Sequence, residues 1–301
     1  MTPTIVLVHG AYADSTSWEG LLGLLPADGR VIAFANPLRG LATDTALLTD
    51  LVRSLDGPVA LVGHSYGGAV MTGVPADAGD IVALVYVAGF ALAPEESAGD
   101  ASALVPGSTL GETLVSVPLS DGGTDTYIAE DKYHHQFCAD LPAEQAAVMA
   151  VTQRPVTQEA LFEPAGDQAL WRSVPSWFVF GELDHNIPAG AHRIMAERAG
   201  ARRTVEIPGA SHVVGIRTPT RSRAWSATRW RTARPSRADR AGAGGSGRRG
   251  GGVGRGRDAD DRGRRGWCSR CRRAGRGRAG PPRGDGVRAD RPRRRGACGG
   301  P

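Results

Sequence analysis

The sequence predicts an α/β fold with a doubly wound, mostly parallel sheet, and two observations support this prediction. Short runs rich in Val, Ile and Leu alternate with stretches of helical pattern along the first 216 residues of the 301-residue chain. The apolar runs are continuous, which is typical of strands that a parallel sheet buries on both faces. Right-handed crossovers between such strands place helices on both faces of the sheet.

Six strands and three helices are expected in this part of the chain. The strands are predicted over Ile5–Val8, Val31–Ala35, Val59–Val62, Ile81–Val87, Trp177–Phe180 and Thr204–Ile207. Helices are predicted over Ser17–Leu25, Thr43–Leu55 and Gly68–Val74. Ligands of a doubly wound sheet bind beyond the carboxyl ends of its strands, so functional residues are expected in the loops that follow them.

The regular alternation stops between about Leu92 and Ala165. Turns containing Pro, Gly and Ser separate helical pieces here, such as Pro142–Val151. We therefore expect a helical cap over residues 92–165. It would be inserted between two parts of the sheet domain, residues 1–91 and 166–216, and would cover the site.

The charge distribution divides the chain into two unlike parts. Residues 1–216 hold 10 Lys and Arg against 25 Asp and Glu, a net charge of −15, whereas residues 217–301 hold 26 Arg and 6 Asp, a net charge of +20. Arg, Gly, Ala, Pro and Ser dominate the second part, and no helical or strand period is sustained there. Such a composition buries too little apolar surface to offset chain entropy, so residues 217–301 are predicted to form a disordered basic tail.

The composition also bears on location. Cys138 is the only cysteine before the tail, so no disulfide supports the fold, as in a reducing compartment. The first predicted strand begins too early for a signal peptide to precede it, and no apolar run approaches the roughly 20 residues that cross a membrane. The sequence predicts a cytoplasmic protein that does not associate with membranes.

The strongest motif follows the third predicted strand. Gly63-His64-Ser65-Tyr66-Gly67 is a G-x-S-x-G sequence between an apolar strand and a helix. In this context the turn is so sharp that the serine hydroxyl is exposed at the helix N-terminus from a strained backbone. An ordinary glycine-rich turn is the alternative, but the flanking strand and helix favour Ser65 as a nucleophile.

A serine hydroxyl is a weak nucleophile and needs a neighbouring base. Among the seven histidines, His212 follows the last predicted strand and is predicted to be this base, because in this architecture an acid and then a histidine follow the serine along the chain. His9 and His64 flank the region of the serine too closely to act as base. His185 and His192 are expected to be loop and helix-surface residues.

Two carboxylates follow the strand that ends at Phe180, namely Glu182 and Asp184. Asp184 stands at the usual spacing from the strand and is predicted to orient His212 and to stabilise the imidazolium formed during catalysis. Glu182 is the alternative acid, although a surface position is expected for it.

Backbone N–H groups are expected to hold the negative oxygen that forms when a serine attacks a carbonyl group. Tyr66 supplies one such group at the start of its helix. Ala11, in the His-Gly turn after the first strand, is predicted to supply the second. Tyr12 and His64, which neighbour these donors, are predicted to contact the substrate.

On these motifs, residues 4–215 resemble the small α/β-hydrolase esterases related to plant methyl-ester esterases and hydroxynitrile lyases. The matching stretches are Ile5–Ala11, Val62–Gly68, Leu84–Ala88 and Ala210–His212, and the cap stretches Gln145–Ala150 and Thr152–Pro155 resemble bacterial members. The resemblance implies an α/β-hydrolase fold and hydrolysis of a small carboxylic ester without a cofactor or metal.

The resemblance leaves other activities open. Lyase members place a threonine after the His-Gly-type turn and a lysine beside the catalytic histidine, and here Ala11 and Val213 stand at those positions, which favours the esterase. Cofactor-free haloperoxidases share the triad, so perhydrolysis stays open as a side activity. A receptor that keeps the pocket without turnover is a further alternative.

The tail offers an alternative of another class. Gly247–Gly252 and Gly254–Arg257 resemble disordered segments that bind nucleic acid through charge and weak stacking. Cys268 and Cys271 have the spacing of zinc ligands, but no second pair follows to complete a four-coordinate site. The alternative is that both features are accidents of composition, and nucleic-acid binding by the tail is not the favoured interpretation.

The tail also fits a frameshifted reading of the C-terminus of a hydrolase. It contains 26 Arg and no Lys, as expected for a GC-rich gene translated out of frame. A shifted reading of Thr218–Arg231 gives Val or Leu at positions 222, 225, 226 and 230, which is the spacing of an amphipathic helix. Sequencing of the source DNA tests this hypothesis, because an intact frame in independent isolates would contradict it.

Overall fold

Six parallel strands form the centre of the computed structural model, which describes residues 2–25 and 29–215. The predicted disordered tail, residues 217–301, lies outside these ranges. The strands are β1 (Thr4–Val8), β2 (Val31–Phe34), β3 (Pro58–His64), β4 (Asp80–Val87), β8 (Ser176–Gly181) and β9 (Arg203–Ile207). They pair in the order β2-β1-β3-β4-β8-β9. All six predicted strands are present, and the predicted α/β-hydrolase fold with a mostly parallel sheet is confirmed.

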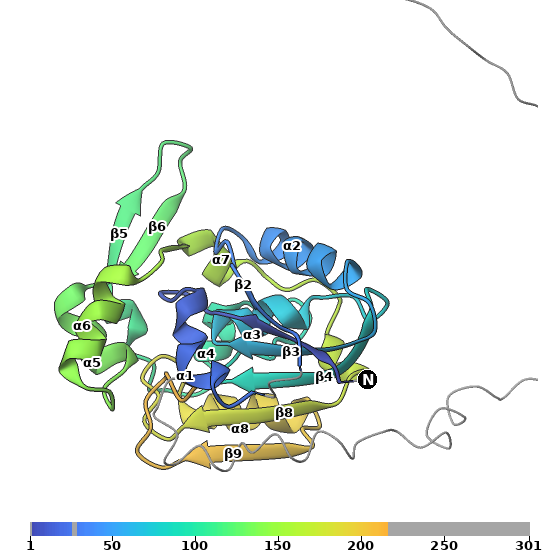
Figure 1. Cartoon of the computed structure of the whole chain (residues 1–301). Coiled ribbons are helices and arrows are strands. Elements are labelled where there is room, and N and C mark those ends of the chain that lie inside the picture. Colours follow the sequence, from blue (N-terminus) through green and yellow to red (C-terminus); the bar gives the residue numbers. More distant parts are fainter. Residues whose placement is uncertain (1, 26–28, 216–301) are drawn as a thin grey trace, which may run out of the picture. The chain divides into compact units, whose positions relative to one another are not determined.

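Helices cover both faces of this sheet (Figure 1). They are α1 (Glu19–Leu22), α2 (Leu41–Arg53), α3 (Tyr66–Thr72) and α8 (Ala189–Arg198), and a 3₁₀ helix, η1 (Ser15–Trp18), precedes α1. In place of the single helix predicted over Ser17–Leu25, the structure has the 3₁₀ helix η1 followed by the short α-helix α1. The start of η1 is fixed by the side chain of Asp14, which accepts the Thr16 N–H.

Two hydrophobic clusters form the core. Side chains alternate between the faces of a strand, so Val6 and Val8 of β1 join one cluster while Leu7 joins the other. The first cluster includes residues of α2, α3 and α8, and the second includes Trp18 and Leu21 of η1 and α1. Both faces of the sheet are thus packed, which agrees with the continuous apolar character of its strands.

The segment between β4 and β8 differs from the predicted helical cap. It contains helices α4 (Ala98–Ser102), α5 (Glu130–Phe137), α6 (Ala143–Thr152) and α7 (Gln158–Phe162), short 3₁₀ helices at Leu110–Thr113 and Leu170–Arg172, and strands β5 (Leu114–Pro118), β6 (Thr124–Ile128) and β7 (Val156–Thr157). These three strands form a separate antiparallel sheet in the order β5-β6-β7. The β5–β6 hairpin stands away from the main sheet in Figure 1.

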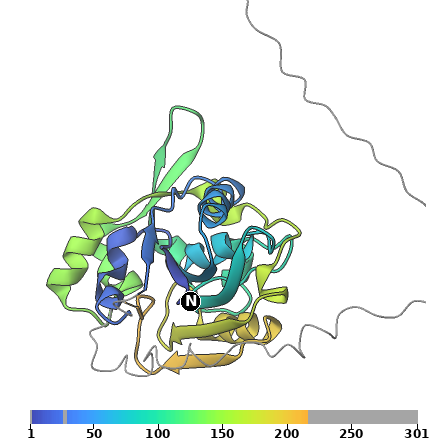
Figure 2. The same cartoon turned by 45° about the vertical axis from the view of Figure 1, so that its right-hand side comes forward.

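The two ends of this segment meet at one place. The N–H of Glu95 donates to the carbonyl of Ala165, and the N–H of Ala165 donates to the carbonyl of Glu96. Figures 1 and 2 show α5 and α6 on the side of the molecule to which the arrowheads of β8 and β9 point. The segment therefore lies at the carboxyl ends of these strands, where ligands of such sheets bind. Among the helices that the structure describes, none is long and apolar enough to cross a membrane.

Candidate active site

Ser65 occupies the turn between β3 and α3 in a strained backbone conformation. Its φ of 51° and ψ of −123° lie in a region that non-glycine residues rarely adopt, and such strain costs about 1–3 kcal/mol. Backbone hydrogen bonds hold it there: the Ser65 N–H donates to the carbonyls of Val87 and Ala88, and its own carbonyl accepts N–H groups from Gly68 and Phe90. This is the strand–turn–helix geometry that the G-x-S-x-G motif predicts.

The glycines of the motif allow α3 to approach the sheet closely. A Cβ atom added at Gly63 would lie 2.7 Å from backbone atoms of Gly67 and Gly68. A Cβ atom added at Gly67 would lie 2.2 Å from the carbonyl oxygen of Val8, at the end of β1. Because backbone atoms cannot move aside cheaply, both positions require glycine.

His212 and Asp184 form a buried pair on the loops that follow β9 and β8. Nδ1 of His212 lies 2.7 Å from Oδ2 of Asp184, and both side chains are fully buried. Burial by itself would raise the pKa of Asp184, but the charge of His212 and hydrogen bonds from His212 and His192 outweigh it and lower the pKa below its usual value. Asp184 is therefore a carboxylate that accepts the Nδ1 proton of His212.

His212 contacts His64, the residue that precedes Ser65 in the chain. The ring centroids of His64 and His212 are 4.8 Å apart, and Nε2 of His64 donates a hydrogen bond to the His212 carbonyl at 3.2 Å. Within residues 2–25 and 29–215, Nε2 of His212 has no hydrogen-bond partner, so no hydrogen bond joins it to Ser65 in this structure. Such contacts are often long in free enzymes and tighten when a substrate binds.

The alternative acid, Glu182, is placed elsewhere. It is exposed, and its carboxylate accepts the N–H of Gly209 at 2.9 Å. The structure brings Asp184, and not Glu182, into contact with His212.

The His-Gly turn after β1 lies directly against Ser65. A Cβ atom added at Gly10 would lie 2.6 Å from Cβ of Ser65, so the turn that carries Ala11 borders the serine. On the other side, Tyr66 is the first residue of α3, and an N–H at that position has no partner within the helix. Both predicted oxyanion donors thus come from segments next to Ser65.

His9 fixes this turn without taking part in proton transfer. Its Nε2 accepts the N–H of Asn36 at 3.0 Å, so the ring proton is on Nδ1, which donates to the Gly10 carbonyl at 3.0 Å. Burial lowers the pKa of His9 and keeps the ring neutral.

Tyr12, a predicted substrate contact, joins the turn after β1 to the segment between β4 and β8. Its hydroxyl lies 3.1 Å from Oγ1 of Thr126 in β6, and its carbonyl accepts the hydroxyl proton of Tyr133 in α5 at 2.8 Å. The side chain is buried, and its hydroxyl already has a hydrogen-bond partner in Thr126.

His64, the other predicted substrate contact, is covered from the same segment. Phe137 packs edge-on against His64 and His212, with ring centroids 6.2 and 5.1 Å apart. Burial, assisted by the charge of His212, lowers the pKa of His64 to about 3. A neutral His64 therefore borders the candidate site, with its ring close to that of His212.

His192 corrects a prediction. The sequence pattern indicated a helix-surface residue, but the side chain is fully buried, stacks on Phe180 with ring centroids 4.7 Å apart, and has its Nε2 atom 3.2 Å from Oδ2 of Asp184. The signal that could have revealed it is the run of small and apolar residues around it in α8, Ala191, Met195 and Ala196, which marks the buried face of that helix.

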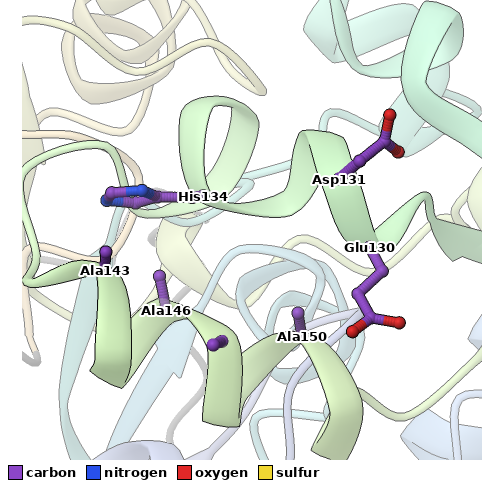
Figure 3. A pocket seen from close by; sticks show the side chains of 7 residues that line it. Glu130, Asp131, His134, Ala143, Ala146 and Ala150 are labelled. Carbon is purple, nitrogen blue, oxygen red and sulfur yellow. The ribbon is translucent and has the colours of Figure 1, made fainter.

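A separate cavity of about 500 Å³ lies between α5 and α6. Its lining consists of Glu130, Asp131 and His134 of α5 and of four alanines of α6, Ala143, Ala146, Ala147 and Ala150 (Figure 3). None of the predicted site residues lines it. Among the described residues, no cluster of three or more His, Cys, Asp or Glu side chains is arranged to hold a metal ion.

Comparisons with solved structures agree with this fold. The chain is 19% identical to polyneuridine aldehyde esterase, with a TM-score of 0.61 over 75% of this chain and 97% of that one. It is 17% identical to a methylesterase from Arabidopsis, with a TM-score of 0.61 over 74% and 97% of the two chains. For a pyrethroid hydrolase from Sphingobium faniae, the identity is 20% and the TM-score 0.55, over 73% and 94%.

Comparison by sequence gives the family. No curated protein sequence matches the chain. The model of the alpha/beta hydrolase family matches residues 5–225, which is most of the chain. That match and the strand order, the serine turn and the buried His–Asp pair agree: the chain belongs to the alpha/beta hydrolase family.

Proposed function

We propose that this protein is a serine hydrolase that cleaves carboxylic esters through an acyl-enzyme. The observation that carries the proposal is the buried hydrogen bond between His212 and Asp184. His212 contacts His64, the residue before Ser65, and Ser65 is held in a strained turn at a helix start. This arrangement supplies a nucleophile, an imidazole base and an ionised group that orients the base.

In the proposed mechanism, the Ser65 hydroxyl attacks the ester carbonyl while Nε2 of His212 takes its proton. The imidazolium formed is stabilised by Asp184, and the negative oxygen of the tetrahedral intermediate is held by the N–H groups of Tyr66 and Ala11. His212 then protonates the leaving alcohol. Water, deprotonated by His212, releases the acid from Ser65 by the same steps.

A carboxylic ester is the proposed substrate class for two reasons. The structural neighbours include proteins named as an esterase, a methylesterase and a pyrethroid hydrolase, which supports hydrolysis on this fold. In addition, Val213 beside the base is apolar and buried, so it cannot take up the charge of a leaving cyanide ion as a lysine would.

Release of cyanide from mandelonitrile should therefore stay at background, and perhydrolysis is at most a side activity.

We also propose that the protein is cytoplasmic and that its partner is a small-molecule ester substrate. Cys138, the one cysteine in the described residues, is buried and free, as expected where disulfides do not form.

The test is the Ser65→Ala variant, measured with a short-chain chromogenic ester and a serine-directed phosphonate. Both turnover and labelling should fall to background because the attacking oxygen is gone. Ser176→Ala removes another buried serine hydroxyl, in β8, and should retain both. Substantial labelling of the Ser65→Ala protein at a different serine would refute the assignment, whereas ligand binding without turnover by the unsubstituted protein would favour a receptor.

A further inference from the structure

A second imidazole contacts the carboxylate that holds His212. Nε2 of His192 lies 3.2 Å from Oδ2 of Asp184, and the same oxygen atom lies 2.7 Å from Nδ1 of His212. All three side chains are fully buried. The mechanism proposed above assigns no role to His192.

The position of His192 on its helix makes a purely structural role difficult to explain. It is the fourth residue of α8, on the buried face that it shares with Ala191, Met195 and Ala196. A polar ring on such a face destabilises the fold unless it finds a hydrogen-bond partner, so an apolar residue would serve packing better. In the part of the chain that the structure describes, the only hydrogen bond of the His192 ring goes to Asp184.

The tautomer of His192 follows from its surroundings. Burial lowers the pKa of His192, so the ring is neutral at neutral pH, although the charges of Asp184 and Glu206 act in the opposite direction. An ionised carboxylate has no proton to donate. The single ring proton of His192 is therefore on Nε2, and it is donated to Asp184.

Asp184 consequently accepts four hydrogen bonds. Oδ1 accepts the backbone N–H groups of Asn186 and Ile187, each at 2.9 Å, and Oδ2 accepts the two imidazole N–H groups. The backbone donors hold only one oxygen atom. His192 is the group, besides the base itself, that fixes the other oxygen atom.

We propose that His192 is a positioning residue, which holds Oδ2 of Asp184 in line with Nδ1 of His212. This inference rests on the proposed function, since it assumes that Asp184 orients His212 for catalysis. His192 touches neither substrate nor Ser65 in this scheme and acts only through the carboxylate.

Three variants test the role. His192→Leu removes the donor and should lower kcat by roughly 10- to 100-fold, the range seen when the hydrogen-bond partner of a metal-binding histidine is lost, while KM changes less than about twofold. His192→Gln keeps an N–H donor at a similar reach and should recover most of kcat. Met195→Ala, a truncation in the same helix at a residue whose sulfur accepts the Ala91 N–H, controls for destabilisation and should lower Tm while leaving kcat within about twofold.

A double-mutant cycle and NMR spectroscopy separate positioning from general damage. In the Asp184→Asn background, His192→Leu should have little further effect on kcat, because the group through which it acts is already altered. In the unsubstituted protein, ¹⁵N NMR of the histidine rings should show the His192 proton on Nε2 at neutral pH. This second measurement does not depend on whether any variant folds.

The outcomes distinguish the two proposals. Turnover that survives Ser65→Ala and Asp184→Asn would overturn the proposed function itself. If those variants lose turnover but His192→Leu retains the kcat of the unsubstituted protein, the positioning role is wrong. It is also wrong if the decrease in kcat caused by His192→Leu is just as large in the Asp184→Asn background. A His192 proton on Nδ1 would also overturn it. Loss in His192→Leu, recovery in His192→Gln and non-additivity with Asp184→Asn support it.

Discussion

Asp184 and Glu182 stand two residues apart after β8 but have different surroundings. Asp184 is buried with a lowered pKa and contacts His212, whereas Glu182 is exposed and holds the Gly209 N–H. Asp184→Asn should lower kcat by about 10³- to 10⁴-fold, because the amide favours the wrong tautomer of His212. Glu182→Gln should change kcat less than about threefold. Steady-state kinetics with one ester substrate compare the two variants, and a larger loss in Glu182→Gln would reverse the choice of acid.

The buried His212–Asp184 pair could be predicted from sequence because each residue lies in the loop after a parallel strand. Such strands end at the same edge of the sheet, so chain order and spacing bring the loops together. His192 could not be assigned in this way. It lies inside a helix next to Arg193, which is exposed and pairs with Glu206, so strand order says nothing about it. Only the spacing of the small and apolar residues of α8 indicates that His192 is on the buried face.

At the scale of elements, Tyr12 connects the turn after β1 to β6. Tyr12→Phe removes the contact between its hydroxyl and Oγ1 of Thr126 and should lower the free energy of unfolding by about 1 kcal/mol, with KM unchanged. Urea denaturation and ester kinetics measure the two effects. Tyr133→Phe, which removes a hydroxyl bonded to the Tyr12 carbonyl, is the matched variant and should behave similarly. A higher KM at unchanged stability would instead make Tyr12 a substrate contact, as its sequence position suggested.

The segment between β4 and β8 was less predictable than the sheet. The main strands are recognisable because they are buried on both faces and therefore continuous in apolar residues. In contrast, β5 belongs to a small sheet at the periphery, and Val115 and Val117 are exposed. The hairpin turn contains Gly122 with a φ of +94°. Short, solvated strands beside glycines have no sustained period, so the sequence pattern indicated only turns and helices there.

For the molecule as a whole, buried neutral histidines predict loss of stability in acid. Burial lowers the pKa values of His9, His64 and His192, while unfolded histidines titrate near pH 6.5. Below that pH the unfolded chain binds protons that the folded protein does not, so the free energy of unfolding falls as pH falls, by about 1.4 kcal/mol per pH unit for each proton. Burial raises the pKa of Asp44, so this carboxylate takes up a proton more readily in the folded protein and opposes the loss of stability. One such group offsets at most one of the three histidine protons.

Urea denaturation between pH 7.5 and pH 5 measures this effect. His192→Gln should reduce the pH dependence by about one proton, because it removes one of the three groups. A free energy of unfolding that stays constant or rises as the pH is lowered to 5 would show that these histidines accept protons in the folded state.

The two backbone hydrogen bonds that join Glu95 and Glu96 to Ala165 have an evolutionary consequence. The inserted segment leaves and re-enters the sheet at one point, so its length and shape can vary by insertion or exchange while the strand register is preserved. Ser65, Asp184 and His212 come from loops outside it. Descendants of such a gene can therefore change the proposed substrate by replacing one continuous stretch of DNA and still inherit the proposed bond-breaking groups intact.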